Sequence, residues 1–312
     1  MTLRYATVRQ LQIFVEAART LSFARVAERL NLTPAAISFQ IRQIEGLSGF
    51  PLFERVGRRV VLTDAGRELL PCARMVLDTL TAADQRMQAL KGVSSGHVTL
   101  GLVSTATYIV PHLMGRFQAD HPAVTITLQD GNRRRILEAL TGGEVDLAVM
   151  GAPPDGAEVD AAPFAPHPTV LIAAPSNPLA GAPGPLPLAA LAGQRFIVRE
   201  DGSGTRALME RFFRAAGFVP DIAMTSSSNE MIKQAVMAGM GVALISRHTI
   251  ALELSGGLLC TPAVEGLPLM RSWYVAQRRH TPALPVQASL RRFLVERAGA
   301  LIEGGQAAEG AD

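Results

Sequence analysis

Residues 22–45 read SFARVAERLNLTPAAISFQIRQIE, and their spacing predicts two short helices joined by a tight turn. Ser22 stands in front of the first apolar repeat, where its hydroxyl can cap a helix, and Asn31 interrupts that repeat. The pattern restarts at Thr33 and Pro34, because a hydroxyl can cap free amides and proline suits the first helical position. The stretch therefore predicts a helical pair whose second helix has a well-defined start.

The outer face of the second helix suits a DNA major groove. Apolar residues at helical spacing form its inner stripe, namely Ala36, Ile37, Ile41 and Ile44. The outer face carries no acidic residue and consists of Ala35, Ser38, Phe39, Gln40, Arg42 and Gln43. Small residues permit close approach, while amide and guanidinium groups can hydrogen-bond to base edges and phosphates. An ordinary helical hairpin with a solvated face shows the same pattern, so the flanking sequence has to distinguish the two.

The positive charge of the chain is concentrated in its first part. The net charge is +3 over 312 residues, yet residues 1–63 carry nine Arg and four Glu, a net charge of +5. The remainder has 21 basic and 23 acidic residues, a net charge of −2. A basic head on a nearly neutral body predicts that only the head binds a polyanion. Double-stranded DNA is the partner that fits the helical pair.

The stretch LSGFPLFERVGRRVVLT, residues 47–63, predicts a turn and a short two-stranded ribbon with Gly57 at its tip. Beside a helix-turn-helix, we interpret the ribbon as a wing whose arginines reach phosphates and the minor groove. A solvated hairpin tip is the alternative interpretation. The predicted DNA-binding residues of the head are Ser22, Thr33, Pro34, Ala35, Ser38, Phe39, Gln40, Arg42, Arg55, Arg58 and Arg59.

Residues 64–91 predict one long helix, about 40 Å in length. Its apolar residues alternate at spacings of four and three, as in a coiled-coil seam: Leu69, Ala73, Val76, Leu80, Ala83, Met87 and Leu90. One more amphipathic helix on the body of a domain would show the same spacing. The length of this helix, and its position between the basic head and the neutral body, favour a dimerising linker. All residues of the seam except Ala73 are predicted dimerisation residues.

Residues 92–301 alternate strand and helix patterns, which predicts an α/β fold with parallel sheets and a ligand site at the carboxyl ends of the strands. Residues 302–312 are predicted to be a disordered tail. The chain contains no apolar run long enough to span a membrane, and MTLRYATVRQ lacks the apolar core of a signal peptide, so we expect a cytoplasmic protein. Cys72 and Cys260 provide neither metal-ligand spacing nor a disulfide framework.

Several polar stretches follow predicted strands and can face a ligand. The loop of residues 199–206, REDGSGTR, combines glycines, a helix start and two arginines, which favours phosphate or carboxylate. Plain helix capping is the alternative interpretation of this loop, and a lone histidine between prolines, such as His167, is more often structural. The predicted effector-binding residues are Ser104, Thr105, Asn132, His167, Arg199, Ser203, Gly204, Thr205, Arg206 and Asn229.

An enzyme and a free solute-binding protein are the rival classes for such a chain. The sequence Gly202-Ser203-Gly204 lacks the spacing of a nucleophile elbow, and no metal-ligand cluster is recognisable. A free solute-binding protein would carry a signal peptide and would not need a basic N-terminal domain. We therefore expect no catalytic residue, no metal and no resident cofactor.

The order of helix, helix-turn-helix, the ribbon PLFERVGRRVVLTDAGRELL and the long linker resembles that of LysR-type transcriptional regulators. The resemblance covers essentially the whole chain. It implies a winged helix-turn-helix in residues 1–63, a linker in 64–91, and a periplasmic-binding-protein-like effector domain of two subdomains. These subdomains would comprise residues 92–161 with 266–301, and residues 162–265. The resemblance also implies self-association as a dimer of dimers.

Five further stretches are similar to regulators of the Calvin-cycle carbon-fixation operon, which control Rubisco genes: GLVSTATYIVPHLMGRF, PFAPHPTVLIAAP, VREDGSGTRALMERFF, SNEMIKQAVMAGMGVALIS and LMRSWYVAQRR. This similarity implies that the effector is a phosphorylated Calvin-cycle metabolite, a nucleotide or NADPH. An anionic effector of this kind fits the loop of residues 199–206, although these residues do not identify the compound.

Overall fold

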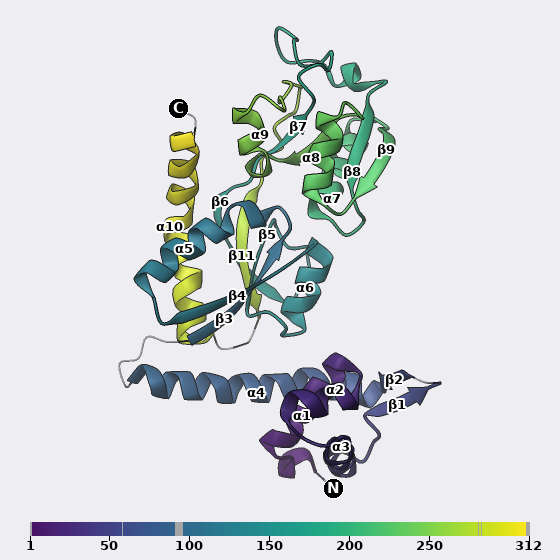
Figure 1. Ribbon diagram of the computed structural model, residues 1–312, viewed down its shortest axis with the longest axis vertical. Coiled ribbons are helices and arrows are strands. Elements are labelled where there is room, and N and C mark those ends of the chain that lie inside the picture. Colours follow the sequence, from purple (N-terminus) through teal and green to yellow (C-terminus); the bar gives the residue numbers. More distant parts are fainter. Residues whose placement is uncertain (1, 58, 91–95, 280, 282, 310–312) are drawn as a thin grey trace. The chain divides into compact units, whose positions relative to one another are not determined.

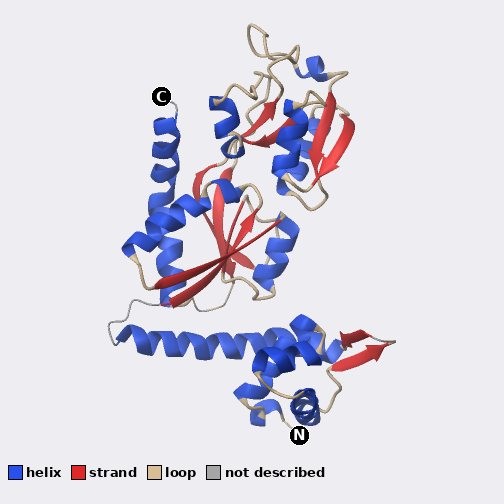
Figure 2. Ribbon diagram, viewed as in Figure 1, coloured by secondary structure: helices blue, strands red, loops and turns tan. Residues whose placement is uncertain are grey.

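The computed structural model describes residues 2–57, 59–90, 96–279, 281 and 283–309. The chain divides into two compact units, which we call the head (Met1–Val93 with Thr281–Leu284) and the body (Ser94–His280 with Pro285–Asp312). The head consists of helices and one small strand pair, whereas the body combines helices with β-sheets (Figures 1 and 2).

The first three α-helices of the head each begin at a capping residue. The head starts with η1 (Leu3–Tyr5), α1 (Val8–Thr20), α2 (Phe23–Leu30) and α3 (Pro34–Ser48). The Thr7 hydroxyl accepts a hydrogen bond from the Gln10 amide at the start of α1, and Thr33 does the same for Ala36 at the start of α3. The Ser22 hydroxyl caps α2. The predicted helical pair and its caps are therefore confirmed.

The turn between α2 and α3 depends on Asn31. Its backbone has a φ of 52°, in the left-handed region that asparagine adopts more readily than most residues. Beyond the turn, the inner stripe of α3 packs into the core of the head, where Ile37, Ile41 and Ile44 are buried. Each such side chain stabilises the fold by roughly 1.5–3 kcal/mol on leaving water. The core therefore fixes α3 with its polar face outward.

The remainder of the head is a strand pair and a long helix. Strands β1 (Phe53–Val56) and β2 (Arg59–Leu62) pair antiparallel around Gly57, whose φ is +63°. Helix α4 (Asp64–Leu90) starts next to Thr63, whose hydroxyl accepts a hydrogen bond from the Gly66 amide, and it runs through Pro71. The predicted ribbon and linker helix are confirmed as elements.

The body contains a first lobe built on a five-stranded sheet with the strand order β4-β3-β5-β11-β6. Its strands are β3 (Gly96–Val103), β4 (Val124–Gly131), β5 (Leu147–Met150), β6 (Val159–Pro166) and β11 (Ser272–Arg278). Its helices are η2 (Ala106–Tyr108), α5 (Val110–Asp120), α6 (Arg133–Thr141) and α10 (Pro285–Glu309). Strand β3 is parallel to β4 and β5, whereas β11 is antiparallel to β5 and β6. The expected parallel pairing is therefore present in β3, β4 and β5, whereas β11 is antiparallel to both of its neighbours.

The second lobe holds two strand pairs. Strands β7 (Thr169–Ile172) and β10 (Ala243–Ser246) are antiparallel, while β8 (Arg195–Arg199) and β9 (Asp221–Ser226) are parallel. The helices of this lobe are η3 (Leu188–Leu191), α7 (Gly204–Ala215), α8 (Asn229–Met237), η4 (Arg247–Thr249) and α9 (Ala251–Ser255). Two buried clusters, around Phe196 and around Ile245, form its core.

The chain crosses between the lobes twice, and the two crossings are hydrogen-bonded to each other. The His167 amide donates to the Arg271 carbonyl oxygen at 2.7 Å, and Thr169 exchanges two backbone hydrogen bonds with Leu269. Because residues 162–166 belong to β6 and pair with β11, the lobe boundary lies at His167 rather than at the predicted position after residue 161. The predicted disordered tail is wrong for residues 302–309, which continue α10; residues 310–312 lie outside the described part.

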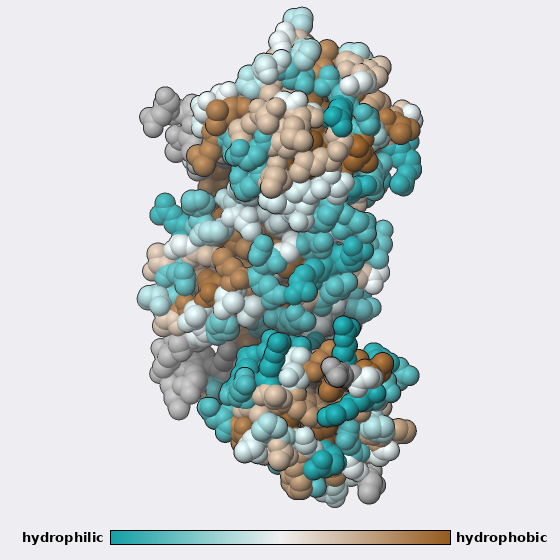
Figure 3. Space-filling model, turned by 45° about the vertical axis from the view of Figure 1, so that its right-hand side comes forward, coloured by the Kyte–Doolittle hydropathy of each residue, from teal (hydrophilic) through white to brown (hydrophobic). Residues whose placement is uncertain are grey.

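None of the described helices is both long enough and apolar enough to cross a membrane. On the face drawn in Figure 3, hydrophobic residues form separate patches among hydrophilic ones. Within the described residues, no group of three or more His, Cys, Asp or Glu side chains is arranged to hold a metal ion.

Candidate functional site

The recognition face of the head is the side of α3 that points away from the core. Ala35, Phe39 and Arg42 are exposed, while Ser38 and Gln40 are half-buried. This face therefore presents the groups that we predicted to meet base edges and phosphates. Contact of these residues with DNA remains a prediction.

The strand pair extends the basic surface of the head. Arg55 lies opposite Val60 and Arg59 lies opposite Val56 in the register of β1 and β2, and both arginine side chains are exposed. Neither forms an ion pair within the described residues. The third predicted wing arginine, Arg58, lies outside the described residues.

Replacement of Arg55 and Arg59 by Ala should weaken binding to all DNA sequences and should reduce its salt dependence. Each lost phosphate contact lowers the slope of log K against log salt by about 0.9. The measurement is fluorescence anisotropy with operator and random duplexes over a salt series. An Arg116→Ala change on α5 of the body serves as the matched control, since it removes an exposed charge outside the head. Equal slopes in the wing variant and the wild type would refute the assignment.

The predicted dimerisation residues divide into two groups along α4. Leu69 is half-buried and packs against the core of the head, in which Ala73 is also buried. Val76, Leu80, Ala83 and Met87 are exposed, while the side chain of Leu90 is outside the described part. Leu69 therefore packs against its own head, and its role in dimerisation stays a prediction.

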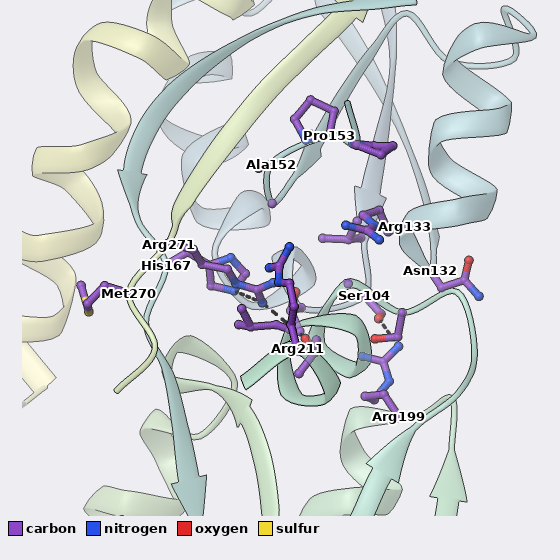
Figure 4. Close-up of a pocket in the computed structure, with 18 of the residues that line it drawn as sticks. Ser104, Asn132, Arg133, Ala152, Pro153, His167, Arg199, Arg211, Met270 and Arg271 are labelled. Carbon is purple, nitrogen blue, oxygen red and sulfur yellow. Dashed lines mark hydrogen bonds between the residues drawn. The ribbon is translucent and has the colours of Figure 1, made fainter. Parts of the chain in front are cut away.

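The body contains a polar cavity of about 470 Å³ lined by both lobes. Figure 4 shows arginine side chains converging on it from several elements. The first lobe contributes the end of β3, the start of α6 and the loop after β5; the second contributes the start of α7. Both crossing segments reach it through His167 and Arg271. Of the predicted effector-binding residues, eight line the cavity: Ser104, Thr105, Asn132, His167, Arg199, Ser203, Gly204 and Thr205.

The start of α7 supplies free backbone donors to this cavity. Gly202 has a φ of +84°, which lets the loop turn sharply before the helix, and the Ser203 hydroxyl caps the Arg206 amide. Among the described residues, none accepts a hydrogen bond from the Gly204 or Thr205 amide. Free amides at a helix start, together with the helix dipole, attract an anion.

Three arginines without acidic partners give the cavity its charge. Arg133, Arg211 and Arg271 line it, and none of them forms an ion pair within the described residues. Burial lowers the pKa of Arg271 from 12.5 to about 10, with further contributions from Arg133 and Arg211, and burial and Arg211 also lower the pKa of Arg133. Arg271 therefore remains charged at neutral pH. Asp155 is the single acid among the described lining residues, so the cavity is electrostatically suited to an anion.

Arg199 mainly cross-links the cavity walls, although it was predicted as a ligand contact. Its side chain is 3% exposed and pairs with Glu200, with nitrogen–oxygen distances of 2.9 and 3.1 Å. It also donates to Asn229 Oδ1 at 2.7 Å and to the Ser104 hydroxyl at 2.8 Å, and so joins the two lobes. Glu200 compensates its charge, which leaves the other three arginines as the anion-attracting groups.

Two predicted effector-binding residues do not line this cavity. Arg206 does not line the cavity, because its guanidinium donates to Glu210 at 2.6 Å and to the Arg199 carbonyl oxygen at 3.1 Å. Asn229 does not line it either; its amide donates to the Ser104 carbonyl oxygen at 3.0 Å. The Asn132 side chain lines the cavity but caps α6.

Arg133, Arg211 and Arg271 line the cavity but are not among the predicted effector-binding residues. Arg211 could have been found, since Gly204, Leu208 and Arg211 follow the i, i+4, i+7 spacing of one helix face. Arg133 directly follows a predicted residue. No sequence pattern around Arg271 predicts that it lines the cavity. The second crossing segment brings it there, far along the chain from the other lining residues.

A second cross-link between the lobes lies beside the cavity. The Tyr108 hydroxyl of the first lobe donates to Glu230 of the second, and burial followed by Glu230 raises the pKa of Tyr108 above its ordinary value of 10. The buried Lys233 ammonium lies 2.7 Å from both Glu230 and Glu253 and also donates to the Thr249 carbonyl oxygen. These contacts attach the segment that follows Ser104 and Thr105 to α8 and α9.

The body is expected to lose stability in acid, because two of its histidines are buried in the neutral form. Burial and Arg247 lower the pKa of His248 from 6.5 to about 4, and burial, Arg271 and His248 lower that of His167 well below 6.5. The unfolded chain takes up these protons near pH 6.5. The histidine contribution to stability is therefore complete above that pH and is lost as the pH falls toward 4. For His248 alone, we expect a loss of roughly 2 kcal/mol between pH 7 and pH 5.

Urea unfolding followed by the fluorescence of Trp273, the single tryptophan of the chain, measures this loss. Trp273 Nε1 donates to His248 Nδ1 at 3.4 Å, so a His248→Asn variant keeps an acceptor near the same position but cannot take up a proton. Its stability should depend less on pH than that of the wild type. An identical pH dependence would contradict the assignment to His248.

Comparison with known families identifies the chain. Residues 8–67 match the bacterial regulatory helix-turn-helix proteins of the lysR family, and residues 91–299 match the LysR substrate binding domain. The chain belongs to the LysR family of transcriptional regulators, and it combines a DNA-binding head with an effector-binding body.

Its relatives include regulators of carbon fixation. The HTH-type transcriptional regulator CbbR of Rhodospirillum rubrum is 46% identical over 287 residues, which cover 92% of this chain and 95% of the relative. The RuBisCO operon transcriptional regulator of Allochromatium vinosum is 42% identical over 294 residues, covering 94% and 97%. The solved CcmR regulatory domain of Synechocystis PCC6803, in complex with 2-PG, is 30% identical with a TM-score of 0.62, covering 65% of this chain and 99% of that domain. The similarity to named regulators agrees with the expectation that the chain is not an enzyme.

Proposed function

We propose that the protein regulates carbon-fixation genes of the Calvin cycle and Rubisco by binding their operator DNA in response to a small anionic metabolite. The observation that carries the metabolite class is the cavity with three arginines lacking acidic partners beside two free amides of α7. The identity of the relatives supports the choice of target genes. As a regulator of chromosomal genes, the protein would act in the cytoplasm.

The effector class that we favour is a small phosphorylated acid. Phosphate and carboxylate both suit guanidinium groups, which bind them in a bidentate manner. Three uncompensated arginines favour a ligand with two or more negative charges over a monoanion. The 2-PG complex of the Synechocystis relative supports this choice. Nucleotides and NADPH, which also carry phosphates, are the competing candidates.

The switch would depend on the cavity walls. A ligand shifts the body only by its differential affinity for two arrangements of the lobes. An anion held by Arg271 at the crossing, by Arg133 of the first lobe and by the start of α7 in the second lobe would favour the closed arrangement. In the structure, Arg134 donates to Asp201 at 3.1 Å across the lobes, an exposed ion pair that holds the lobes together only weakly.

We further propose that the protein self-associates, first through α4 and then as a dimer of dimers. The exposed apolar residues Val76, Leu80 and Met87 would pair with the same residues of a second copy. Two paired heads could then bind successive major-groove faces of one duplex.

Titration calorimetry with matched probes tests the effector class. 3-Phosphoglycerate carries a phosphate and a carboxylate, glycerol 3-phosphate lacks the carboxylate, and glycerate lacks the phosphate. We expect affinity to fall in that order, with 2-PG binding as well as 3-phosphoglycerate. NADPH is included as the large competitor. Absence of binding by every phosphorylated probe would refute a phosphorylated effector.

Footprinting on the promoter adjacent to the chain's own gene tests the regulatory function. We expect protection of this promoter by the protein alone, and an altered pattern when the best probe from the calorimetry is added. Protection of an unrelated promoter with equal affinity would refute sequence-specific regulation.

A further inference from the structure

His167 lies at the first crossing between the lobes and is locked in place there. It follows β6 directly, its amide donates to the Arg271 carbonyl oxygen, and its side chain is 1% exposed. Its ring stacks on the Trp273 ring with 3.5 Å between centroids and 8° between planes. The position of the imidazole is therefore set by the backbone and by its aromatic neighbour together.

The hydrogen bond between His167 and Arg271 can run in only one direction. His167 Nε2 lies 3.2 Å from Arg271 Nη2, and a guanidinium nitrogen can only donate. Nε2 must therefore accept, which places the single ring proton on Nδ1 and keeps the imidazole neutral. Burial, followed by Arg271 and His248, holds the pKa of His167 well below 6.5, so this neutral form persists across the physiological range.

The second hydrogen of Arg271 Nη2 also has a partner. The Thr205 hydroxyl at the start of α7 accepts it at 3.4 Å. Nη2 is therefore held from two sides, by the crossing segment and by the second lobe. The other nitrogens of this guanidinium have no hydrogen-bond partner within the described residues, and Nε is buried.

We propose that His167 is a positioning residue, which fixes the Arg271 guanidinium at the cavity through the acceptor Nε2 and makes no ligand contact of its own. The inference rests on the proposed function, since it assigns how the anion site is kept in place. Arg133 and Arg211 line the same cavity and carry the same charge as Arg271, so a fixed acceptor helps to keep the Arg271 side chain there without a ligand. A neutral acceptor fixes the group without cancelling its charge, which a carboxylate at this position would do.

A purely structural role for His167 predicts a different dependence on side-chain chemistry. If the ring only fills space against Trp273, an aromatic replacement should preserve anion binding. If the acceptor matters, binding should depend on an acceptor at the Nε2 position whether or not the ring is present. Three replacements separate these two roles.

His167→Phe keeps a ring on Trp273 but lacks an acceptor. His167→Gln loses the ring but places an amide oxygen near the Nε2 position. His167→Asn has the same amide, but its shorter side chain places the oxygen near the Nδ1 position. We expect the Phe and Asn variants to bind 3-phosphoglycerate about tenfold more weakly than the wild type, the scale of one hydrogen bond to a charged group. The Gln variant should bind within roughly threefold of the wild type.

Calorimetry on the full-length chain with 3-phosphoglycerate and sulfate as probes gives these affinities. Urea unfolding followed by Trp273 fluorescence gives the stability of each variant, so that a weakly binding but unfolded variant is recognised. If the Gln variant is unstable, the affinity of the Phe variant alone tests the proposal, because this variant keeps a ring stacked on Trp273. Wild-type affinity in the Phe variant would refute the proposal.

The sulfate arm adds a pH profile. Sulfate keeps its charge between pH 8 and pH 5.5, and the neutral His167 should make its binding independent of pH over this range. A change in affinity centred near pH 6.5 that disappears in the Gln variant would show that His167 titrates, contrary to the proposal. Failure of the wild type to bind either probe would refute the proposed anion site itself. Equal binding by the wild type and the variants would instead refute only the positioning role of His167.

Discussion

An Arg271→Ala variant is expected to bind 3-phosphoglycerate roughly a hundredfold more weakly than the wild type. The replacement removes a half-buried charge that has no acidic partner among the described residues, together with the N–H groups left free by His167 and Thr205. Hydrogen bonds to charged groups are each worth about 1.5–3 kcal/mol, and two of them account for a loss of this size. Calorimetry measures the affinity, and footprinting should show operator protection that no longer responds to the probe.

Two matched variants control this result. Arg271→Lys keeps the charge but loses the planar fork, so its affinity should lie between those of the wild type and the Ala variant. Arg206→Ala removes an arginine from the same region that turns away from the cavity toward Glu210, so it should bind the probe as the wild type does. If Arg206→Ala abolished the response while Arg271→Ala retained it, the anion site would lie elsewhere.

A Leu80→Asp variant is expected to sediment as a monomer and to lose at least about a hundredfold in operator affinity. Leu80 is an exposed apolar residue of α4, and pairing would bury its replacement carboxylate without a partner. A monomer carries one head and loses the gain in affinity that comes from two linked heads on one duplex. Sedimentation velocity gives the oligomeric state, and fluorescence anisotropy gives the affinity.

Thr81→Asp is the control for this change. Thr81 is exposed on the same helix but lies outside the apolar seam, so an added charge there should leave both assembly and affinity unchanged. Wild-type sedimentation of Leu80→Asp would remove α4 as the dimerisation element. Monomers with full operator affinity would instead show that one head suffices for binding.

The head could be predicted from the sequence because its determinants are local. Ser22 and Thr33 cap the helices that directly follow them, and the stripe of Ile37, Ile41 and Ile44 repeats within three turns. Local spacing therefore contains nearly all of the information that places α2 and α3. The seam on α4 was less predictable, because Leu69 and Ala73 have the same spacing as the exposed residues but pack into the head.

The cavity could be predicted only in part, because its residues meet through the topology. The start of α7 was found from its glycines and its capping serine, which are local signals. Of the two arginines Arg206 and Arg211, only Arg211 lines the cavity, because Arg206 pairs with Glu210 instead. The sequence alone does not show which face of α7 is turned toward the cavity. Arg271 contacts Thr205 only because the second crossing segment brings the chain back to the first, beside the start of α7. No periodicity in the sequence contains that information.

The paired crossing segments at His167 and Arg271 also determine the mechanics of the body. Because the two segments are hydrogen-bonded to each other, we expect any rotation of the lobes to take place about this pair of segments, to which Arg271 belongs. Groups near an axis of rotation move little, whereas Arg133 and the start of α7 lie on opposite walls and swing through longer arcs. An anion that first meets Arg271 is therefore held at a nearly stationary point while the walls approach it. Binding of the anion at Arg271 and closure of the two walls would then be separate steps. The first would depend on the charge of Arg271, and the second on the contacts that Arg133 and the start of α7 make with the bound anion.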